Sequence, residues 1–162
     1  MDTKEQNMEH ADPSQATLRV NGIDLNGSVA DGPGIRLVVY LQGCDREVKC
    51  AHCHNPSTHS QEGGTVMSVD DIVSELRKSP IRKVTVSGGE PLAQAGGLRI
   101  LLAALKKNGF DVALYTWRQK GQVPKDVLDK VDWLKVGEFR YELTTSTMAF
   151  VGSSNQRFMK VA

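Results

Sequence analysis

Four short apolar runs with helical patterns between them constrain the fold of this chain most strongly. The runs cover residues 37–41, 83–87, 112–116 and 133–136, and the first of them is short, β-branched and apolar, as expected of a strand buried on both faces. Alternating strands and helices predict a parallel sheet with right-handed crossovers. With 162 residues, the chain suits one domain and falls short of the roughly 250 residues of a complete (β/α)8 barrel. We therefore predict an α/β fold, a single-domain incomplete β/α barrel with a mainly parallel sheet.

The helical patterns carry clear start and stop signals. Ser68 begins a capping-box sequence, and the apolar residues that follow have helical spacing: Val69, Ile72, Val73 and Leu76. A second helix is predicted over 98–107, with Gly109 as its left-handed cap, and a third near 124–130. An edge strand is expected around 150–151.

Composition and charge indicate where the domain begins, which partners to expect and where in the cell the protein acts. Residues 1–16 are polar and lack periodicity, so we expect a mobile tail before a domain spanning 17–162. The net charge of +1 gives no reason to expect a nucleic-acid or membrane partner. The longest apolar run, 100–105, is far shorter than the roughly 20 residues of a membrane span, and the N-terminus has no apolar signal core. We therefore expect a cytoplasmic protein.

All three cysteines lie in residues 44–55, CDREVKCAHCHN, directly after the first run. In a reducing compartment such thiols are more often metal ligands than disulfide partners. One interpretation is zinc, bound by Cys44, Cys50, Cys53 and either His54 or His59, although structural zinc sites usually combine two ligand pairs. The other is a [4Fe–4S] cluster, which normally takes four thiolates. With three, one iron stays open and could chelate an amino-acid head group.

The sequence Gly88-Gly89-Glu90-Pro91 follows the second run. It could be an ordinary turn. Alternatively, the two glycines let a ligand approach the backbone, and Glu90 can accept a hydrogen bond from an ammonium group. Because the carboxyl ends of parallel strands share one edge, we expect the cysteine loop, this loop and Thr116 to meet there. That combination would suit S-adenosylmethionine held by its methionine end.

With these motifs, the chain resembles the radical S-adenosylmethionine superfamily over residues 18–162. The segment DGPGIR at 31–36 looks like the lead-in of glycyl-radical-enzyme activases. The ending FVGSSNQR at 150–157, together with 136–139 before it, resembles the activating proteins of anaerobic (class III) ribonucleotide reductases. The residue pattern leaves open whether the polar side chains of 153–156 bond to local backbone or to a cofactor.

The resemblance implies a specific reaction. Cys44, Cys50 and Cys53 would ligate three irons, and the open iron would bind the amino and carboxylate groups of S-adenosylmethionine. One electron would then give methionine and a 5′-deoxyadenosyl radical, which takes a hydrogen from a glycine of the anaerobic ribonucleoside-triphosphate reductase. An external electron donor such as flavodoxin or ferredoxin is implied as a second partner. The implied cofactor contacts are His52, Cys53, His54, Gly88, Gly89 and Glu90, and Thr116 is a further candidate from its place at a strand end.

Two alternative functions stay open, and the sequence differs from the family pattern at two places. The alternatives are a radical enzyme that acts on another glycyl radical enzyme or on a small molecule, and a non-catalytic zinc or iron–sulfur module. Five residues, 45–49, separate the first two cysteines, where the family shows three, and His54 replaces the usual aromatic residue. Because 45–49 is highly charged, we expect it to bulge outward into solvent.

Overall fold

The computed structural model describes residues 12–161, which form one seven-stranded sheet and three α-helices. The strands are β1 (Thr17–Ser28), β2 (Arg36–Leu41), β3 (Thr65–Ser68), β4 (Lys83–Gly88), β5 (Asp111–Tyr115), β6 (Trp133–Val136) and β7 (Arg157–Lys160). The helices are α2 (Val69–Leu76), α3 (Ala95–Lys107) and α4 (Lys125–Leu128). Short 3₁₀ turns lie at η1 (Pro56–Thr58), η2 (Pro91–Gln94), η3 (Lys120–Gln122) and η4 (Tyr141–Leu143). None of the helices in this described part has the length and apolar character to cross a bilayer.

The sheet has a parallel centre and antiparallel sides. Its order is β3-β1-β2-β4-β5-β6-β7, with β2, β4, β5 and β6 parallel and the outer strands antiparallel. This confirms the predicted α/β class and the parallel core of an incomplete barrel. The predicted edge strand at 150–151 is wrong. Phe150 has a φ of 65°, outside the extended region, and the edge strand is instead β7.

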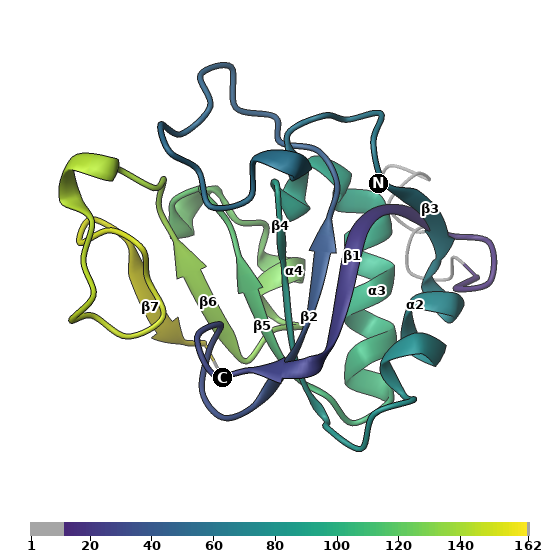
Figure 1. Ribbon diagram of the computed structural model, residues 1–162. Helices are drawn as coiled ribbons and strands as arrows, with labels where there is room; N and C mark the ends of the chain where they lie inside the picture. The colour runs from purple at the N-terminus through teal and green to yellow at the C-terminus, as the bar shows by residue number, and fades with distance from the viewer. Residues whose placement is uncertain (1–11, 162) are drawn as a thin grey trace.

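The helices cover one face of the sheet (Figure 1). Ser68 caps α2 as predicted, since its hydroxyl accepts a hydrogen bond from the amide of Asp71 at 3.0 Å. The predicted apolar faces of α2 and α3 are buried against alternate residues of the central strands, and this burial drives the packing. No helix of the described residues lies on the other face of the sheet (Figure 1).

The expected mobile tail, residues 1–16, lies mostly outside the described residues, which begin at Asp12. Within 12–16, the carbonyls of Pro13 and Ala16 accept hydrogen bonds from the first turn of α2 at 3.2 and 2.9 Å. The mobility of the tail stays a prediction. Strands β1 and β3 were not predicted from the sequence pattern. β1 is rich in Asn, Asp and Gly, which have weak strand propensity, so its pairing with β2 and β3 decides its structure.

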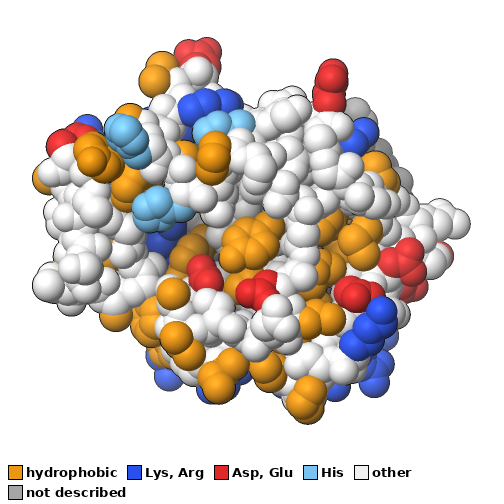
Figure 2. All heavy atoms as spheres, in the orientation of Figure 1, with side chains coloured by type: hydrophobic (Ala, Val, Ile, Leu, Met, Phe, Trp, Pro, Cys, Tyr) orange, Lys and Arg blue, Asp and Glu red, His pale blue; other side chains and the backbone are white. Residues whose placement is uncertain are grey.

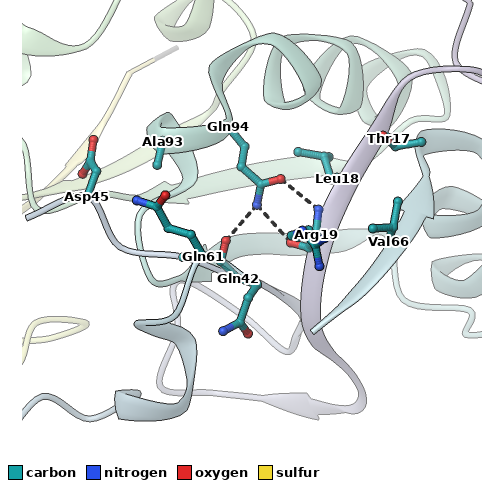
Figure 3. A pocket seen from close by; sticks show the side chains of 10 residues that line it. Thr17, Leu18, Arg19, Gln42, Asp45, Gln61, Val66, Ala93 and Gln94 are labelled. Carbon is teal, nitrogen blue, oxygen red and sulfur yellow. Dashed lines mark hydrogen bonds between the residues drawn. The ribbon is translucent and has the colours of Figure 1, made fainter. Parts of the chain in front are cut away.

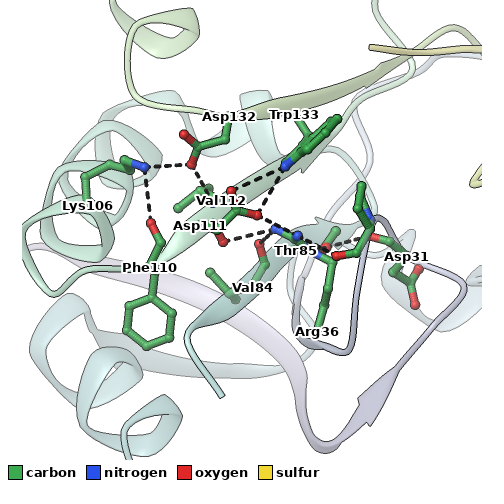
Figure 4. A network of polar contacts seen from close by, with 11 residues as sticks. Asp31, Arg36, Val84, Thr85, Lys106, Phe110, Asp111, Val112, Asp132 and Trp133 are labelled. Carbon is green, nitrogen blue, oxygen red and sulfur yellow. Dashed lines mark hydrogen bonds and ion pairs between the residues drawn. The ribbon is translucent and has the colours of Figure 1, made fainter. Parts of the chain in front are cut away.

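Arg36, the last residue of DGPGIR, ties the amino ends of three strands together (Figure 4). Its side chain is 0% exposed, and all five of its N–H donors have acceptors. The acceptors lie 2.6–3.0 Å away: Thr85 Oγ1, the carbonyls of Pro33, Val84 and Asp111, and Asp111 Oδ2. The motif therefore has a structural role here, at the edge of the sheet opposite the cysteines.

Candidate functional site

The two loops that were predicted to meet at the carboxyl edge of the sheet do so. Leu41 of β2 pairs with Gly88 of β4, and the amide of Glu90 donates to the carbonyl of Gly43 at 2.8 Å. Gly88 has a φ of 116°, and a Cβ there would lie 2.3 Å from the oxygen of Leu41. A Cβ at Gly89 would lie 2.2 Å from the oxygen of Gly43. Both glycines are thus required by the close approach of the two loops.

Glu90 joins the loops that follow β4 and β5. Its buried carboxylate accepts hydrogen bonds from the hydroxyl of Thr116 at 2.7 and 2.9 Å, and from the amides of Leu92 and Trp117. Arg118 forms an ion pair with it at 3.2 Å. Burial raises the pKa of Glu90, and these donors oppose the rise. Both carboxylate oxygens already have partners in the protein, so its contact with a ligand stays a prediction.

The three cysteines are free thiols. They lie on the loop that follows β2, which runs above the carboxyl ends of β2 and β4 (Figure 1). Cys44 is buried, which raises the pKa of its thiol, while Cys50 and Cys53 are partly exposed. Within residues 12–161, no three Cys, His, Asp or Glu side chains converge to hold a single metal ion. Three thiolates on one loop supply ligands for three irons of a [4Fe–4S] cluster, so the donor set fits that group.

Cys50 and Cys53 line a cavity of about 120 Å³ that also contains His54, Gly88 and Gly89 among its walls. Thr116 lines it as well, whereas Cys44, His52 and Glu90 do not. Ligand sites usually measure roughly 300–1,000 Å³. The cavity therefore has room for only part of a nucleoside-sized ligand.

The histidines of the cysteine loop pack on aromatic side chains of the loop that follows β6. His52 is exposed and lies against Tyr141, with ring centres 4.1 Å apart, and His54 lies against Phe139 at 4.6 Å. In Figure 2, histidine side chains gather at the upper left, and the surface below them is hollowed. The two loops thus meet through ring contacts beside the cavity.

Tyr115 and Lys135 are cavity residues that sequence reasoning missed. The Tyr115 hydroxyl is buried and has no hydrogen-bond partner among the described residues, which is unusual for a buried polar group. Lys135 Nζ lies 4.6 Å from the centre of the Tyr115 ring. Burial lowers the pKa of Lys135 to about 8, although Glu90 and other anionic groups oppose the shift. A hydroxyl and an ammonium in one cavity suit the carboxylate of an amino acid.

A signal for Lys135 was present in the sequence. It interrupts the apolar run Trp-Leu-Lys-Val, and a strand's alternation places it on the face opposite Leu134 and Val136. Those two side chains are buried in the core, so the lysine must lie on the helix-free face. Which cavity it reaches depends on the partner strands, and those are not visible in a local pattern.

The GSSNQ segment bonds to local backbone. Gln156 Oε1 accepts hydrogen bonds from the amides of Gly152 and Ser153 at 2.9 and 3.2 Å, and its Nε2 donates to the carbonyl of Gly137 at 3.0 Å. Asn155 Nδ2 donates to the carbonyl of Glu138 at 2.8 Å. The segment therefore fastens the loop after β6, and through Gly152 and Gln156 it forms part of the cavity wall.

The long segment 45–49 does not simply bulge into solvent. Asp45, Glu47 and Val48 are exposed as expected, while Arg46 and Lys49 are half-buried. The segment is nevertheless anchored, since Asp45 accepts hydrogen bonds from Trp117 Nε1 at 3.1 Å and from Arg118 Nη2 at 2.5 Å.

A larger hollow of about 370 Å³ lies on the other side of the cysteine loop, between β1, β3 and η2 (Figure 3). Gln94 spans it, since its Oε1 accepts from the amide of Arg19 at 2.8 Å. Its Nε2 donates to the carbonyls of Arg19 and Gln42 at 3.0 Å. This amide is fully used in joining structural elements, and no thiol lines the hollow. The candidate chemistry therefore belongs to the smaller cavity.

Comparison with known proteins agrees with an iron–sulfur role for the three cysteines. Residues 30–159 match the family of 4Fe–4S single cluster domains, and the chain belongs to this family. It is 38% identical over 104 residues to the pyruvate formate-lyase-activating enzyme of Clostridium pasteurianum, covering 60% of this chain and 42% of that protein. It is 39% identical over 106 residues to the same enzyme of Staphylococcus aureus, covering 60% and 40%.

The chain thus spans about two fifths of the length of the curated relatives it matches. Among solved structures, QueE from Escherichia coli aligns with a TM-score of 0.48 and 17% identity, over 81% of this chain and 72% of that one. The family match bears out the predicted [4Fe–4S] cluster.

Proposed function

We propose that this protein is a radical S-adenosylmethionine activase that generates a glycyl radical on an anaerobic ribonucleoside-triphosphate reductase. The observation that carries the proposal is a loop with three thiols at the carboxyl edge of the sheet. Two of these thiols line a cavity with an unpartnered hydroxyl. The names of the relatives support the activase class. The GSSNQ resemblance supports the reductase as target.

The residues of the site would divide the work as follows. Cys44, Cys50 and Cys53 would hold the cluster, which supplies the electron for reductive cleavage of S-adenosylmethionine when bound. Tyr115 and Lys135 would bind the carboxylate of its methionine end.

The remaining predicted contacts would act around that centre. His54, Gly88, Gly89 and Thr116 line the cavity and would touch the cofactor directly. His52, which does not line the cavity, would hold the cysteine loop against the loop after β6 through its ring contact with Tyr141. Glu90 would hold Thr116 in place through its two hydrogen bonds.

The external partners follow from the small number of thiols. The chain has three cysteines, enough for one cluster, so the electron would come from a separate protein such as flavodoxin or ferredoxin.

A pyruvate formate-lyase is the second candidate target, and it is favoured by the 38–39% identity to its activating enzymes. A cytoplasmic location, where both targets would be met, is part of the proposal.

The test is anaerobic reconstitution followed by activation of purified targets. The reconstituted protein should contain about four irons per chain and matching sulfide. With a reductant and S-adenosylmethionine it should release 5′-deoxyadenosine and produce a glycyl-radical EPR signal on the reductase. A signal on pyruvate formate-lyase alone would shift the target to the second candidate. Stoichiometric zinc without sulfide would refute the activase.

A further inference from the structure

Arg46 reaches back from the long cysteine spacing to the second cysteine of the loop. Its Nη1 donates to Cys50 Sγ at 2.6 Å, and its Nη2 donates to Glu138 Oε2 at 2.7 Å. The guanidinium carbon lies 5.6 Å from the centre of the Trp117 ring. The Arg46 side chain is 18% exposed. A sulfur, a carboxylate and an aromatic face thus hold this cation beside the thiols.

The backbone around Arg46 is fixed by its neighbours in the same segment. Lys49 Nζ donates to the carbonyls of Cys44 and Arg46 at 2.5 and 2.6 Å, which folds the segment back on itself. Asp45 anchors the start of the segment to the loop after β5. The guanidinium is therefore held in place at the sulfur, four residues before Cys50 in the sequence.

The charge of Arg46 is only partly compensated. Glu138 also pairs with Arg140, whose Nε lies 3.0 Å from its other oxygen, so one carboxylate serves two guanidinium groups. An arginine stays protonated at every pH a protein experiences. A permanent, poorly hydrated positive charge therefore lies against one thiol of the proposed cluster.

We propose that Arg46 tunes the cluster by stabilising its reduced state. The reduction potential of an iron–sulfur cluster depends on net charge, on hydrogen bonds to the sulfurs and on exposure to solvent. One electron from a low-potential donor takes [4Fe–4S]²⁺ to [4Fe–4S]¹⁺, and no bond or proton at Arg46 changes. The cation favours the form with the extra negative charge, so the cluster accepts the electron from a weaker reductant. This inference rests on the cluster assignment of the proposed function.

The experiment is a redox titration of the reconstituted protein with dithionite, followed by EPR of the reduced cluster. Arg46→Gln should lower the equilibrium constant for reduction about tenfold, which for one electron is about 59 mV towards more negative potential. Arg46→Lys keeps the charge but loses the two-pronged geometry, and it should shift the constant in the same direction by less. Iron and sulfide contents must match those of the wild type.

Arg140→Gln is the matched control, because it removes the same charge from the same carboxylate without touching a sulfur. Its reduction constant should stay within about twofold of the wild type, since an exposed charge is largely screened. Loaded Arg46→Gln with an unchanged potential would overturn the inference, as would an equal shift in Arg140→Gln. If Arg46→Gln fails to take up the cluster, Arg46→Met replaces it as the charge-free variant, and an unchanged potential in loaded Arg46→Met overturns the inference. Failure of the wild type to assemble any [4Fe–4S] cluster would instead remove the proposed function, and the inference with it.

Discussion

Replacing Arg36 by methionine should strongly destabilise the fold without touching the cysteine loop. Methionine has a similar reach but no hydrogen-bond donors. The change leaves a hydroxyl oxygen, three carbonyls and the Asp111 carboxylate without the donors they now have. Trp133 Nε1, at 3.2 Å, still donates to the carboxylate of Asp111, so that group is not left completely unpaired.

The size of the loss follows from the burial. Removing one partner of a buried ion pair costs about 3–5 kcal/mol, because the other charge stays behind. The Asp111 side chain is 37% exposed and can be hydrated, which keeps the loss from rising above that range. A chain of this size loses about 2–4 °C of melting temperature per kcal/mol. We therefore expect Arg36→Met to melt about 6–20 °C below the wild type.

The assay is urea and thermal unfolding of the cluster-free protein in reducing buffer, followed by circular dichroism. Arg77→Met is the control, since Arg77 is exposed and makes one long hydrogen bond, and it should change stability by less than about 0.5 kcal/mol. A loss below about 1 kcal/mol for Arg36→Met, with an unchanged dependence on urea, would refute the structural role of the DGPGIR arginine.

Three further changes probe the site. Lys135→Met should raise stability at pH 7 by up to about 3 kcal/mol, because the folded pKa of about 8 lies below the unfolded 10.5. In the wild type, the cost of burying the charged lysine is complete below pH 8 and disappears towards pH 10.5. Urea melts should therefore show the free energies of unfolding of the two proteins converging towards pH 10.5. A constant difference between them across this pH range would contradict the prediction. Tyr115→Phe should keep or raise cluster-free stability, because it removes a buried hydroxyl without a partner, and equilibrium dialysis should show S-adenosylmethionine binding to the loaded protein three- to tenfold more weakly. Equal affinity would exclude the hydroxyl as a contact. Gly88→Ala should lose more than about 2 kcal/mol in a urea melt, while Gly96→Ala, with open space around its Cβ, should be neutral or stabilising; similar losses would mean that the loops can separate.

Local patterns predicted the elements whose own residues determine them. Ser68 and the apolar spacing after it define α2, and the four apolar runs define the parallel strands. β1 and β7 were missed or misplaced because distant strands stabilise them. The polar residues of β1 have no strand preference of their own, and β7 lies after the turn at Phe150.

The candidate site divides along the same line. Topology alone brings the cysteine loop, Gly88 and Thr116 to one edge, since strand ends in a parallel sheet share that edge. The directions of single side chains depended on non-local partners. Lys135 and Tyr115 meet from two different strands, and the return of Arg46 to Cys50 depends on how their shared loop folds, so no periodicity reports either contact.

The Arg36 network and the thiols occupy opposite edges of the same sheet, and this separation has a consequence for mutational tolerance. Substitutions around Arg36 should be rejected in any selection that requires folded protein, whether or not iron is present. Substitutions around Cys50 should be accepted in an abundance screen and, under the proposed function, rejected only when the host must grow without oxygen. A deep mutational scan read under both selections would therefore separate into two maps, one for each edge of the sheet.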